Sequence, residues 1–174
     1  MYDTNERRRA IEQLLRTSAE PITGNQLAAL YGVSRQIIVQ DMAVLRAGGL
    51  EVEASAQGYR IKQDTGNFAC VVACRHSGMD ELKRELYAVA DAGACVSDII
   101  VEHPVYGEIV GKLFINSRAS ADQLVENLSQ PGVAPLSVVT GGLHLHTITA
   151  PTQQVLDMAV TALKINGFVV ELAE

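Results

Sequence analysis

The first sixty residues carry two kinds of hydrophobic pattern. Between residues 4 and 20, and again between 34 and 47, apolar positions recur every three or four residues, which predicts helices. A shorter helix is predicted at 25–31, after Thr23, a residue type that favours the position before a helix. From residue 50 to 61 the pattern alternates around the turn Ser55-Ala56-Gln57-Gly58. Alternation around a glycine-containing turn predicts a β-hairpin.

Three helices followed by a hairpin are the order of a winged helix-turn-helix. The run LAALYGVSRQIIVQDMAVLRAGG, residues 27–49, resembles the small winged-helix domain at the N-terminus of many bacterial repressors. Its third helix begins after Ser34, and the first turns of such a helix can enter a major groove. Arginine and glutamine contact guanine and adenine edges, and the hairpin residues Arg60 and Lys62 suit phosphates. The residues expected to contact DNA are Ser34, Arg35, Gln36, Val39, Gln40 and Arg60.

Charge separates the chain into two parts. Residues 1–62 hold eight basic and seven acidic residues, whereas residues 63–174 hold six basic and thirteen acidic ones, so the net charges are +1 and −7. The concentration of basic residues in the first part favours DNA binding there. The alternative is a helical protein-interaction module, and Asp41 and Glu53 lie where acidic groups do not help DNA binding. We therefore expect domains at 1–62 and 68–174, joined by a polar linker at 63–67.

Composition limits the class of protein. The chain has 174 residues, of which 48% are hydrophobic and 20% charged, so it can fold as one domain or two small ones. The N-terminus lacks the apolar core of a signal peptide, and the uncharged stretch 127–156 is too rich in proline, glycine and polar residues for a membrane helix. We therefore expect no membrane partner. Three cysteines, an odd number without the spacing of a disulfide framework, indicate a reduced, cytoplasmic protein.

The second part reads as an α+β domain. Its patterns predict helices on one face of a mixed sheet. Strands are expected at 68–74, 94–101, 107–115, 136–139, 143–148 and 168–172, and helices at 79–92, 119–128 and 151–166.

All four histidines lie in this second part. His144 and His146 are two residues apart on a predicted strand, so both imidazoles point to one face, an arrangement that suits half of a metal site. His76 follows the first strand, and Glu85 borders the buried stripe of the next helix while Arg84 points away. Together His76, Glu85, His144 and His146 offer three nitrogens and one oxygen. The alternative is that these histidines are ordinary polar residues on a sheet.

The cysteines offer a second metal-binding hypothesis. Cys70 and Cys74 share one face of the first strand of this domain, Cys95 lies on the next, and thiolates bind zinc well. The surrounding alanines and valines favour buried, inert thiols instead.

The segments VEHPVYGEI and GGLHLHTITAP, after a winged helix, resemble the bacterial transcriptional repressors with a three-histidine (3H) domain. This resemblance covers nearly the whole chain. It implies one divalent transition metal per chain (nickel, zinc, cobalt or iron), held at the matching positions His76, Glu85, His144 and His146. It also implies a response to nicotinic acid in the control of NAD-precursor uptake or synthesis. His103 matches a family motif; we expect it and Tyr106 to contact the effector, or His103 to act only as a turn residue before Pro104.

The sequence therefore predicts a non-enzymatic, DNA-binding transcriptional repressor. A small carboxylate, nicotinate by the resemblance, would bind a metal-containing regulatory domain and set the affinity of a homodimer for a palindromic operator. Two alternatives remain at this point. One is a metal-dependent hydrolase with a regulatory head, because a site with three histidines, a glutamate and an open position can activate water. The other is a repressor that senses the metal alone.

Overall fold

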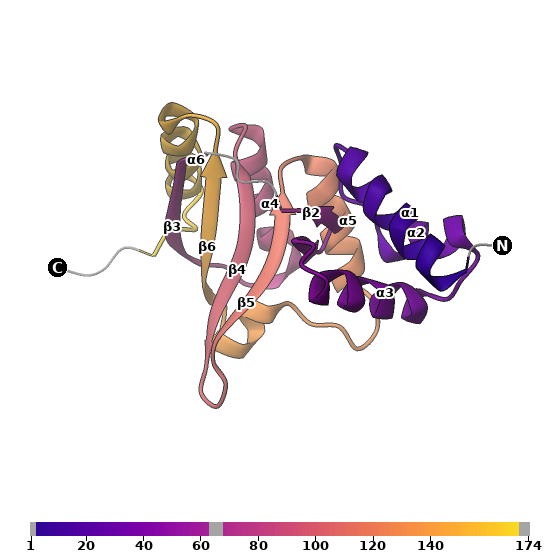
Figure 1. Cartoon of the computed structure of the whole chain (residues 1–174). Helices are drawn as coiled ribbons and strands as arrows, with labels where there is room; N and C mark the ends of the chain where they lie inside the picture. Colours follow the sequence, from indigo (N-terminus) through magenta and orange to yellow (C-terminus); the bar gives the residue numbers. More distant parts are fainter. Residues whose placement is uncertain (1–2, 63–67, 171–174) are drawn as a thin grey trace. The chain divides into compact units, whose positions relative to one another are not determined.

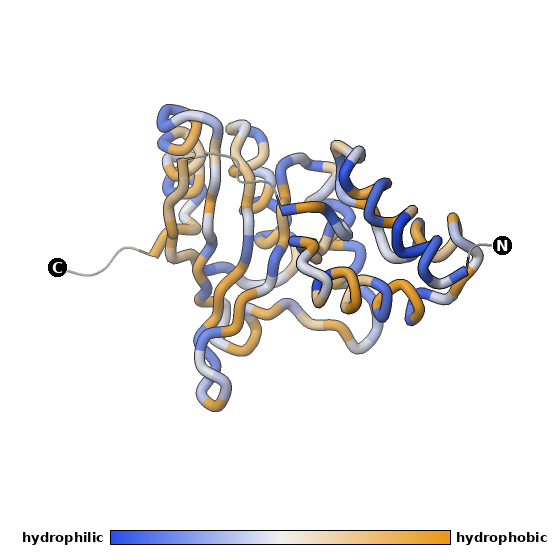
Figure 2. The backbone as a smooth tube through the Cα atoms, in the orientation of Figure 1, coloured by the Kyte–Doolittle hydropathy of each residue, from blue (hydrophilic) through white to orange (hydrophobic). Residues whose placement is uncertain are grey.

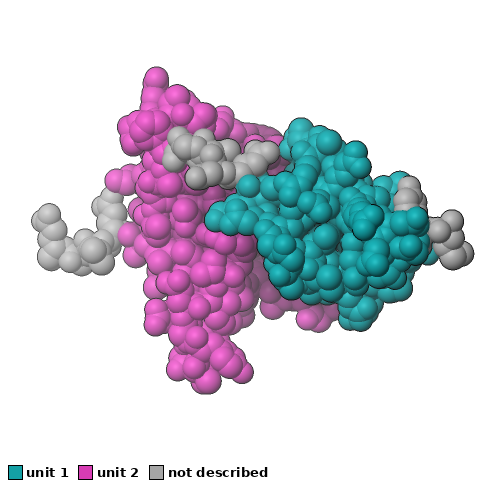
Figure 3. Space-filling view, viewed as in Figure 1, with its two compact units in different colours: residues 1–64 teal, residues 65–174 magenta. Residues whose placement is uncertain are grey.

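The computed structural model describes residues 3–62 and 68–170 (Figure 1). The chain divides into two compact units, residues 1–64 and 65–174, which Figure 3 shows in different colours. The expected linker at 63–67 lies outside the described residues. None of the helices in the described part is long and apolar enough to cross a membrane.

The first unit is a three-helix bundle with a two-stranded wing. Its core gathers apolar side chains from all three helices, among them Ile11, Leu27 and Ile38, each fully buried. The wing strands pair antiparallel from Val52–Ile61 to Ser55–Gly58. Its elements are α1 (Thr4–Thr17), α2 (Gly24–Tyr31), α3 (Arg35–Ala47), β1 (Val52–Ser55) and β2 (Gly58–Ile61).

Side-chain caps define where these helices begin. Thr23 and Ser34 cap α2 and α3, each accepting a hydrogen bond from a backbone N–H of the first turn. Thr4 is a residue type that favours the N-cap and was predicted to cap the first helix, but this was wrong by one residue, because Asp3 caps α1. Asp3 accepts two backbone N–H groups, and Glu6 completes a capping box. The apolar spacing of the helix predicted at 25–31 places Leu27, Ala28 and Leu30 on its inner side. Leu30 is instead 62% exposed, because Tyr31 packs against the core from that last turn.

The second unit is a four-stranded sheet with helices on one side. The strand order is β3-β6-β4-β5. Its elements are β3 (Phe68–Arg75), α4 (Gly78–Asp91), β4 (Cys95–His103), β5 (Gly107–Ile115), α5 (Arg118–Leu128), the 3₁₀ helix η1 (Leu136–Thr140), β6 (Leu143–Ala150) and α6 (Gln153–Ile165).

Every pair of neighbouring strands in this sheet is antiparallel, where a mixed sheet was expected. Strands β3 and β4, joined through α4, run in the same direction but are not neighbours. Strand β6 lies between them and is antiparallel to both. The gap left by the first βαβ crossover is therefore filled by a strand from the far end of the domain, as in a split βαβ fold.

The core of this unit lies between the sheet and its helices. Along β6, His144, His146, Ile148 and Ala150 are buried, while the residues between them are more exposed. Helices α4, α5 and α6 pack on this buried side, which we call the helix face; the opposite side is the open face. Figure 2 shows the mixture of hydrophobic and hydrophilic residues along the strands.

Three sequence-based expectations fail in this unit. The strand expected at 136–139 is η1, which follows Pro135 and ends at Gly141 in the left-handed conformation. The strand expected at 168–172 is reduced, within the described residues, to one bridge between Val169 and Cys74. The apolar spacing of the helix predicted at 151–166 places Met158 on its inner side. Met158 is instead 52% exposed, because the buried stripe of α6 runs through Leu156, Ala159 and Leu163.

Candidate functional site

Three imidazoles surround one buried carboxylate in the second unit. The Nε2 atoms of His76 and His144 each lie 3.3 Å from Oε2 of Glu85, and Nε2 of His146 lies 3.4 Å from it. All four residues are buried, with Glu85 fully so and His76, the most exposed, at 7%. The structure thus brings together the four residues that the sequence analysis predicted as a set of metal ligands.

The topology explains why these residues meet. His144 lies opposite Cys74 in the β3–β6 ladder, so His76, just beyond the end of β3, lies beside Gly142 at the start of β6. Gly142 has φ +92°, and a Cβ built there would lie 2.3 Å from the carbonyl oxygen of His76. Only glycine permits this close approach of two backbones. Glu85 enters from the buried side of α4.

Hydrogen bonds fix the protons on two of the histidines. Nδ1 of His144 donates to the carbonyl of Gly142 at 2.8 Å, and Nδ1 of His146 donates to the carbonyl of Asp98 at 2.6 Å. A carbonyl oxygen can only accept, so each Nδ1 carries a proton, and each Nε2 faces the Glu85 carboxylate. A hydrogen bond from the ring nitrogen on the outer side is typical of metal-binding histidines.

The cluster contains a buried negative charge that a cation would balance. Burial by itself raises the pKa of the Glu85 carboxyl, but hydrogen bonds with His144, His146 and His76 outweigh it and hold the pKa well below its usual value. Glu85 is therefore a buried anion, which is costly unless protons on the surrounding imidazoles or a bound cation balance its charge.

Two unpartnered atoms support the same conclusion. Among the described residues, Nδ1 of His76 and Oε1 of Glu85 are buried without a hydrogen-bond partner. The ligand atoms of His76, Glu85 and His144 all lie within 4.8 Å of one another. Imidazole nitrogens with one carboxylate oxygen are a donor set that divalent transition metals accept. The residues present therefore fit such an ion.

A cavity of about 250 Å³ adjoins the cluster. His76, Glu85 and His146 contribute to its wall, and leucines from α4, β5, α5 and η1 supply most of the rest. Gly111 of β5 also lines it; a Cβ there would lie 3.2 Å from Cγ2 of Ile99, across the sheet. A glycine inside a strand weakens the strand and marks a place where space is needed. The cavity thus joins a polar end to an apolar body.

The cysteines do not gather into a site. Cys70 and Cys74 pair with Ile148 and His144 and so lie on the helix face, whereas Cys95 pairs with Thr149 and lies on the open face. Burial, and after it the nearby Glu85 carboxylate, raises the pKa of the Cys74 thiol far above its ordinary value. The thiol is therefore held protonated, which is the inert form.

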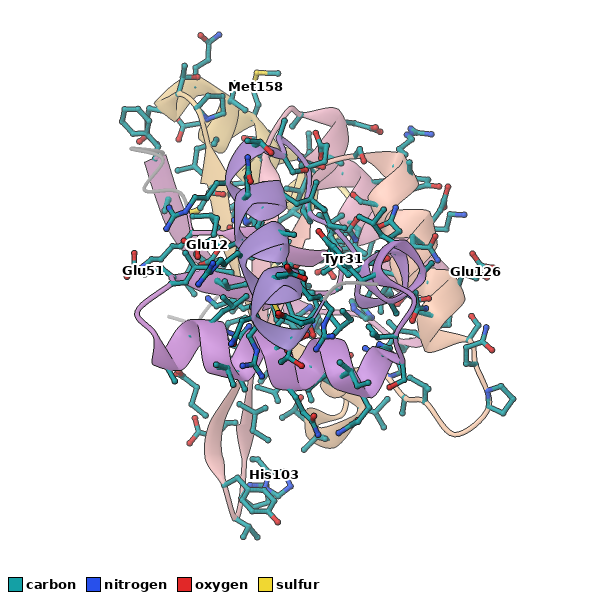
Figure 4. The ribbon with its side chains drawn as sticks, turned by 45° about the vertical axis from the view of Figure 1, so that its right-hand side comes forward. Glu12, Tyr31, Glu51, His103, Glu126 and Met158 are labelled. Atoms are coloured by element: carbon teal, nitrogen blue, oxygen red, sulfur yellow. The ribbon has the colours of Figure 1, made fainter. Side chains whose placement is uncertain are left out.

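His103 and Tyr106 lie away from the histidine cluster, at the tip of the β4–β5 hairpin (Figure 4). Nδ1 of His103 accepts the backbone N–H groups of Val105 and Tyr106 at 3.1 and 3.2 Å. The two rings contact each other with centroids 4.8 Å apart, and Tyr106 is 77% exposed. His103 therefore holds the turn, and the structure does not bring this pair to the cavity.

Sequence reasoning missed the parts of the site that are not ligand side chains. Gly111 leaves space for the cavity, and Gly142 permits the close approach to the backbone of His76. The Asp98 carbonyl accepts the proton on Nδ1 of His146. The strand-internal Gly111 was a detectable signal, because glycine is rare inside strands. The Asp98 carbonyl carried none, since every residue has one.

The third helix of the first unit presents the residues expected to contact DNA. Ser34 caps it by accepting the N–H of Ile37 at 3.3 Å, and Ile38 and Met42 bury its opposite side. The side that faces solvent carries Ser34, Arg35, Gln36, Val39 and Gln40, all exposed.

The acidic residues that weighed against DNA binding are both paired. Asp41 is buried and accepts hydrogen bonds from Arg7 at 2.7 Å and Arg8 at 2.8 Å, so its charge is neutralised inside the unit. Glu53 forms an ion pair with Arg60 at 3.2 Å across the wing. The wing arginine nominated for phosphates therefore already has a carboxylate partner.

Comparison with known proteins finds one domain family in the first part of the chain and another in the second. Residues 7–60 match an HTH domain family, and residues 69–172 match the 3H domain family. The chain belongs to the 3H domain family. A protein named probable transcription repressor NiaR, from Thermotoga maritima, is 39% identical over 166 residues, covering 95% of this chain and 94% of the relative. Transcription repressor NadR from Bacillus subtilis is 35% identical over 161 residues, covering 90% and 89%.

This kinship confirms the predicted family and fold class. The chain is a regulator of the NiaR and NadR type, with an HTH domain followed by a 3H domain. The names of both relatives support a transcription repressor and not an enzyme, which weighs against the hydrolase alternative.

Proposed function

We propose that this 3H domain protein is a metal-dependent transcription repressor that senses a small carboxylate, nicotinate by the family resemblance. The metal would be held by His76, Glu85, His144 and His146, and nickel, zinc, cobalt and iron all suit these donors. The protein would act as a cytoplasmic homodimer on a palindromic operator, with residues 63–67 linking the two domains. The observation that carries the proposal is the convergence of three Nε2 atoms on one buried carboxylate oxygen.

The cavity beside the cluster supports a flat organic acid as the effector. Its volume of about 250 Å³ and its leucine walls suit an aromatic ring. When bound, the ion would supply a positive charge and an open coordination position for a pyridine nitrogen or a carboxylate oxygen. The chain's own residues would exclude water from the ring and keep the imidazoles in the tautomers that face it.

The segment η1 connects the wall of the cavity with the strand that carries His144 and His146. Leu136, in the first turn of η1, lines the cavity, and the same segment leads through Gly141 and Gly142 to the ligands of β6. An effector that contacts Leu136 and the metal together would favour one arrangement of this segment. A ligand shifts an equilibrium only through such differential contacts.

The test is operator binding by the metal-loaded full-length protein, with and without nicotinate, nicotinamide and a chelator. A change of operator affinity, in either direction, that needs both nicotinate and metal supports the proposal. A response to metal alone would assign the protein to metal sensing. Binding that ignores both would contradict the proposal.

Filling the cavity should abolish the effector response without removing the metal. In Gly111→Val, the added side chain would compete with Ile99 and Leu136 for space, because even a Cβ lies 3.2 Å from Ile99 and 3.8 Å from Leu136. We expect nicotinate binding, measured by calorimetry, to weaken roughly a hundredfold or more, since overpacking costs about 1–3 kcal/mol in addition to the lost space. Metal content should stay at the wild-type level. Unchanged nicotinate affinity would place the effector elsewhere, with the exposed His103–Tyr106 hairpin as the next region to test.

Replacing the outward residues of α3 should weaken operator binding. Arg35→Ala and Gln36→Ala each remove a side chain from the exposed first turn, and each specific base contact contributes about 1–3 kcal/mol. Gel-shift titration should therefore show roughly a fivefold to hundredfold loss of operator affinity. Gln13→Ala, on the exposed side of α1, serves as the control. If both α3 variants bind the operator like the wild type, this helix does not read the groove.

A further inference from the structure

Strand β4 contains a β-bulge beside the histidine cluster. Val96 pairs with Ile148 on the helix face. Asp98, two residues later, pairs with Thr147 on the open face, and the register of the two strands shifts between these pairs. In a regular strand, residues two apart share a face, so β4 holds one extra residue here, Ser97. Bulges are common next to functional sites, where they redirect a group, and this one lies opposite the part of β6 that enters the cluster.

Asp98 binds β6 through both its carboxylate and its carbonyl. Oδ1 of the carboxylate accepts the backbone N–H of Thr147 at 3.1 Å. The carbonyl oxygen accepts Nδ1–H of the preceding residue of β6, His146, at 2.6 Å. Oδ2 of the carboxylate forms an ion pair with Lys112 of β5 at 2.8 Å, and Asp98 is buried. A single residue therefore holds both the backbone of β6 and the ring of a proposed metal ligand.

The irregular register continues into β5 and strains its backbone. Val96 pairs with Ile115. Asp98 pairs with Lys112, so two residues of β5 lie opposite one of β4. Phe114 is one of the two, and among the described residues other than glycine it alone has a positive φ, +56°. A bulky residue in this conformation is strained, and such strain persists only where the surrounding structure enforces it, often at functional sites. The domain thus maintains this register although regular pairing would be less strained.

We propose that Asp98 is a positioning residue for the metal site, because its carboxylate fixes the bulge that aims the Asp98 carbonyl at His146. This role rests on the proposed function, since it treats His146 as a metal ligand. With the carbonyl in place, Nδ1 of His146 keeps its proton on the outer side, and Nε2 is directed at the cluster.

The carboxylate also keeps another donor away from that carbonyl. Without the carboxylate, the backbone N–H of Thr147 needs a new acceptor, because an unpaired backbone N–H is costly. The carbonyl of Asp98 is the nearest candidate by register, since these two residues pair in the ladder. It would then turn from the ring of His146 toward the backbone, and the ring would lose the hydrogen bond that orients it.

The test uses the full-length protein with Co²⁺ as the probe, because the visible absorption of Co²⁺ reports the geometry of its ligands. Asp98→Ala should bind Co²⁺ roughly tenfold more weakly and shift the absorption bands. Tenfold is the low end of the loss expected when a partner of a metal ligand is removed, since the carbonyl itself remains in the chain. Asp98→Asn keeps an oxygen that can accept the N–H of Thr147, and it should recover most of the wild-type affinity and spectrum.

Two controls separate positioning from general stability. Glu102→Ala also removes a carboxylate from β4, but from an exposed position, and it should leave Co²⁺ affinity unchanged. Thr152→Ala removes the N-cap of α6, where the Thr152 hydroxyl accepts the N–H of Val155. Loss of a cap destabilises the unit, so Tm should fall while the Co²⁺ affinity and spectrum stay the same.

The outcomes distinguish this role from the metal site itself. Unchanged Co²⁺ affinity and spectrum in Asp98→Ala, no recovery in Asp98→Asn, or an equal loss in Thr152→Ala would each overturn the role of Asp98 and leave the metal site standing. A wild type that binds neither Co²⁺ nor Zn²⁺ would overturn the metal site and this role together. If Asp98→Ala does not fold, NMR of the Zn²⁺-loaded wild type decides: the Nδ1 proton of His146 should be protected from exchange with solvent, and rapid exchange would contradict the proposal.

Discussion

His146→Ala and Glu85→Gln should each lose most of their metal during dialysis, while the wild type keeps one equivalent. Each substitution removes one of four donors from a buried site. Glu85→Gln also removes the negative charge that lies within 3.4 Å of all three imidazoles. Removing a group that only hydrogen-bonds to a metal ligand already lowers metal affinity about 10–100-fold, so removing a ligand should lower it at least as much. Elemental analysis of the dialysed proteins measures the effect.

Two variants on the same helix serve as controls. Asp80→Asn makes the same carboxylate-to-amide change on the exposed first turn of α4, and Arg84→Ala shortens an exposed side chain next to Glu85 in sequence. Both should retain the full equivalent of metal. If His146→Ala retains it as well, or if Arg84→Ala loses metal while Glu85→Gln does not, the ligand assignment is wrong.

Gly142→Ala should destabilise the second unit and impair metal binding, although it changes no ligand. The new Cβ would lie 2.3 Å from the carbonyl oxygen of His76, and the backbone φ of +92° disfavours any side chain. Because one strained backbone conformation alone costs about 1–3 kcal/mol, the clash should bring the total to roughly 3 kcal/mol or more. For a unit of this size that is roughly a 12 °C fall in Tm, taking about 4 °C for each kcal/mol. Thermal unfolding followed by circular dichroism, with metal and with chelator, measures it.

The neighbouring glycine provides the matched control. Gly141 also has a positive φ, +61°, but a Cβ there would meet no atom within 4 Å. Gly141→Ala should therefore show only the backbone strain, about 1 kcal/mol, and keep its metal. Equal destabilisation of the two variants would show that the close approach to His76 contributes nothing of its own.

The faces that carry the clustered side chains were predictable because local rules govern them. Strand periodicity alone places His144 and His146 on one face, and helix periodicity places Glu85 with the buried stripe of its helix. Likewise, the cap at Ser34 and the spacing of Ile38 and Met42 determine which side of the third helix faces solvent. These patterns act within a few residues, so the printed sequence contains them.

Only the tertiary structure decided how these local pieces combine. The insertion of β6 between β3 and β4 brings His144 and His146 to His76, and no local pattern encodes which strands become neighbours. The same holds for Asp41, which looked like a surface charge and is instead buried between two arginines more than thirty residues away in the sequence. The protonation of His146 is set by a backbone carbonyl of a different strand. Contacts between distant residues depend on the packing of the whole domain. This is why the four residues of the cluster could be named from the sequence, while their geometry, the cavity and the open face could not.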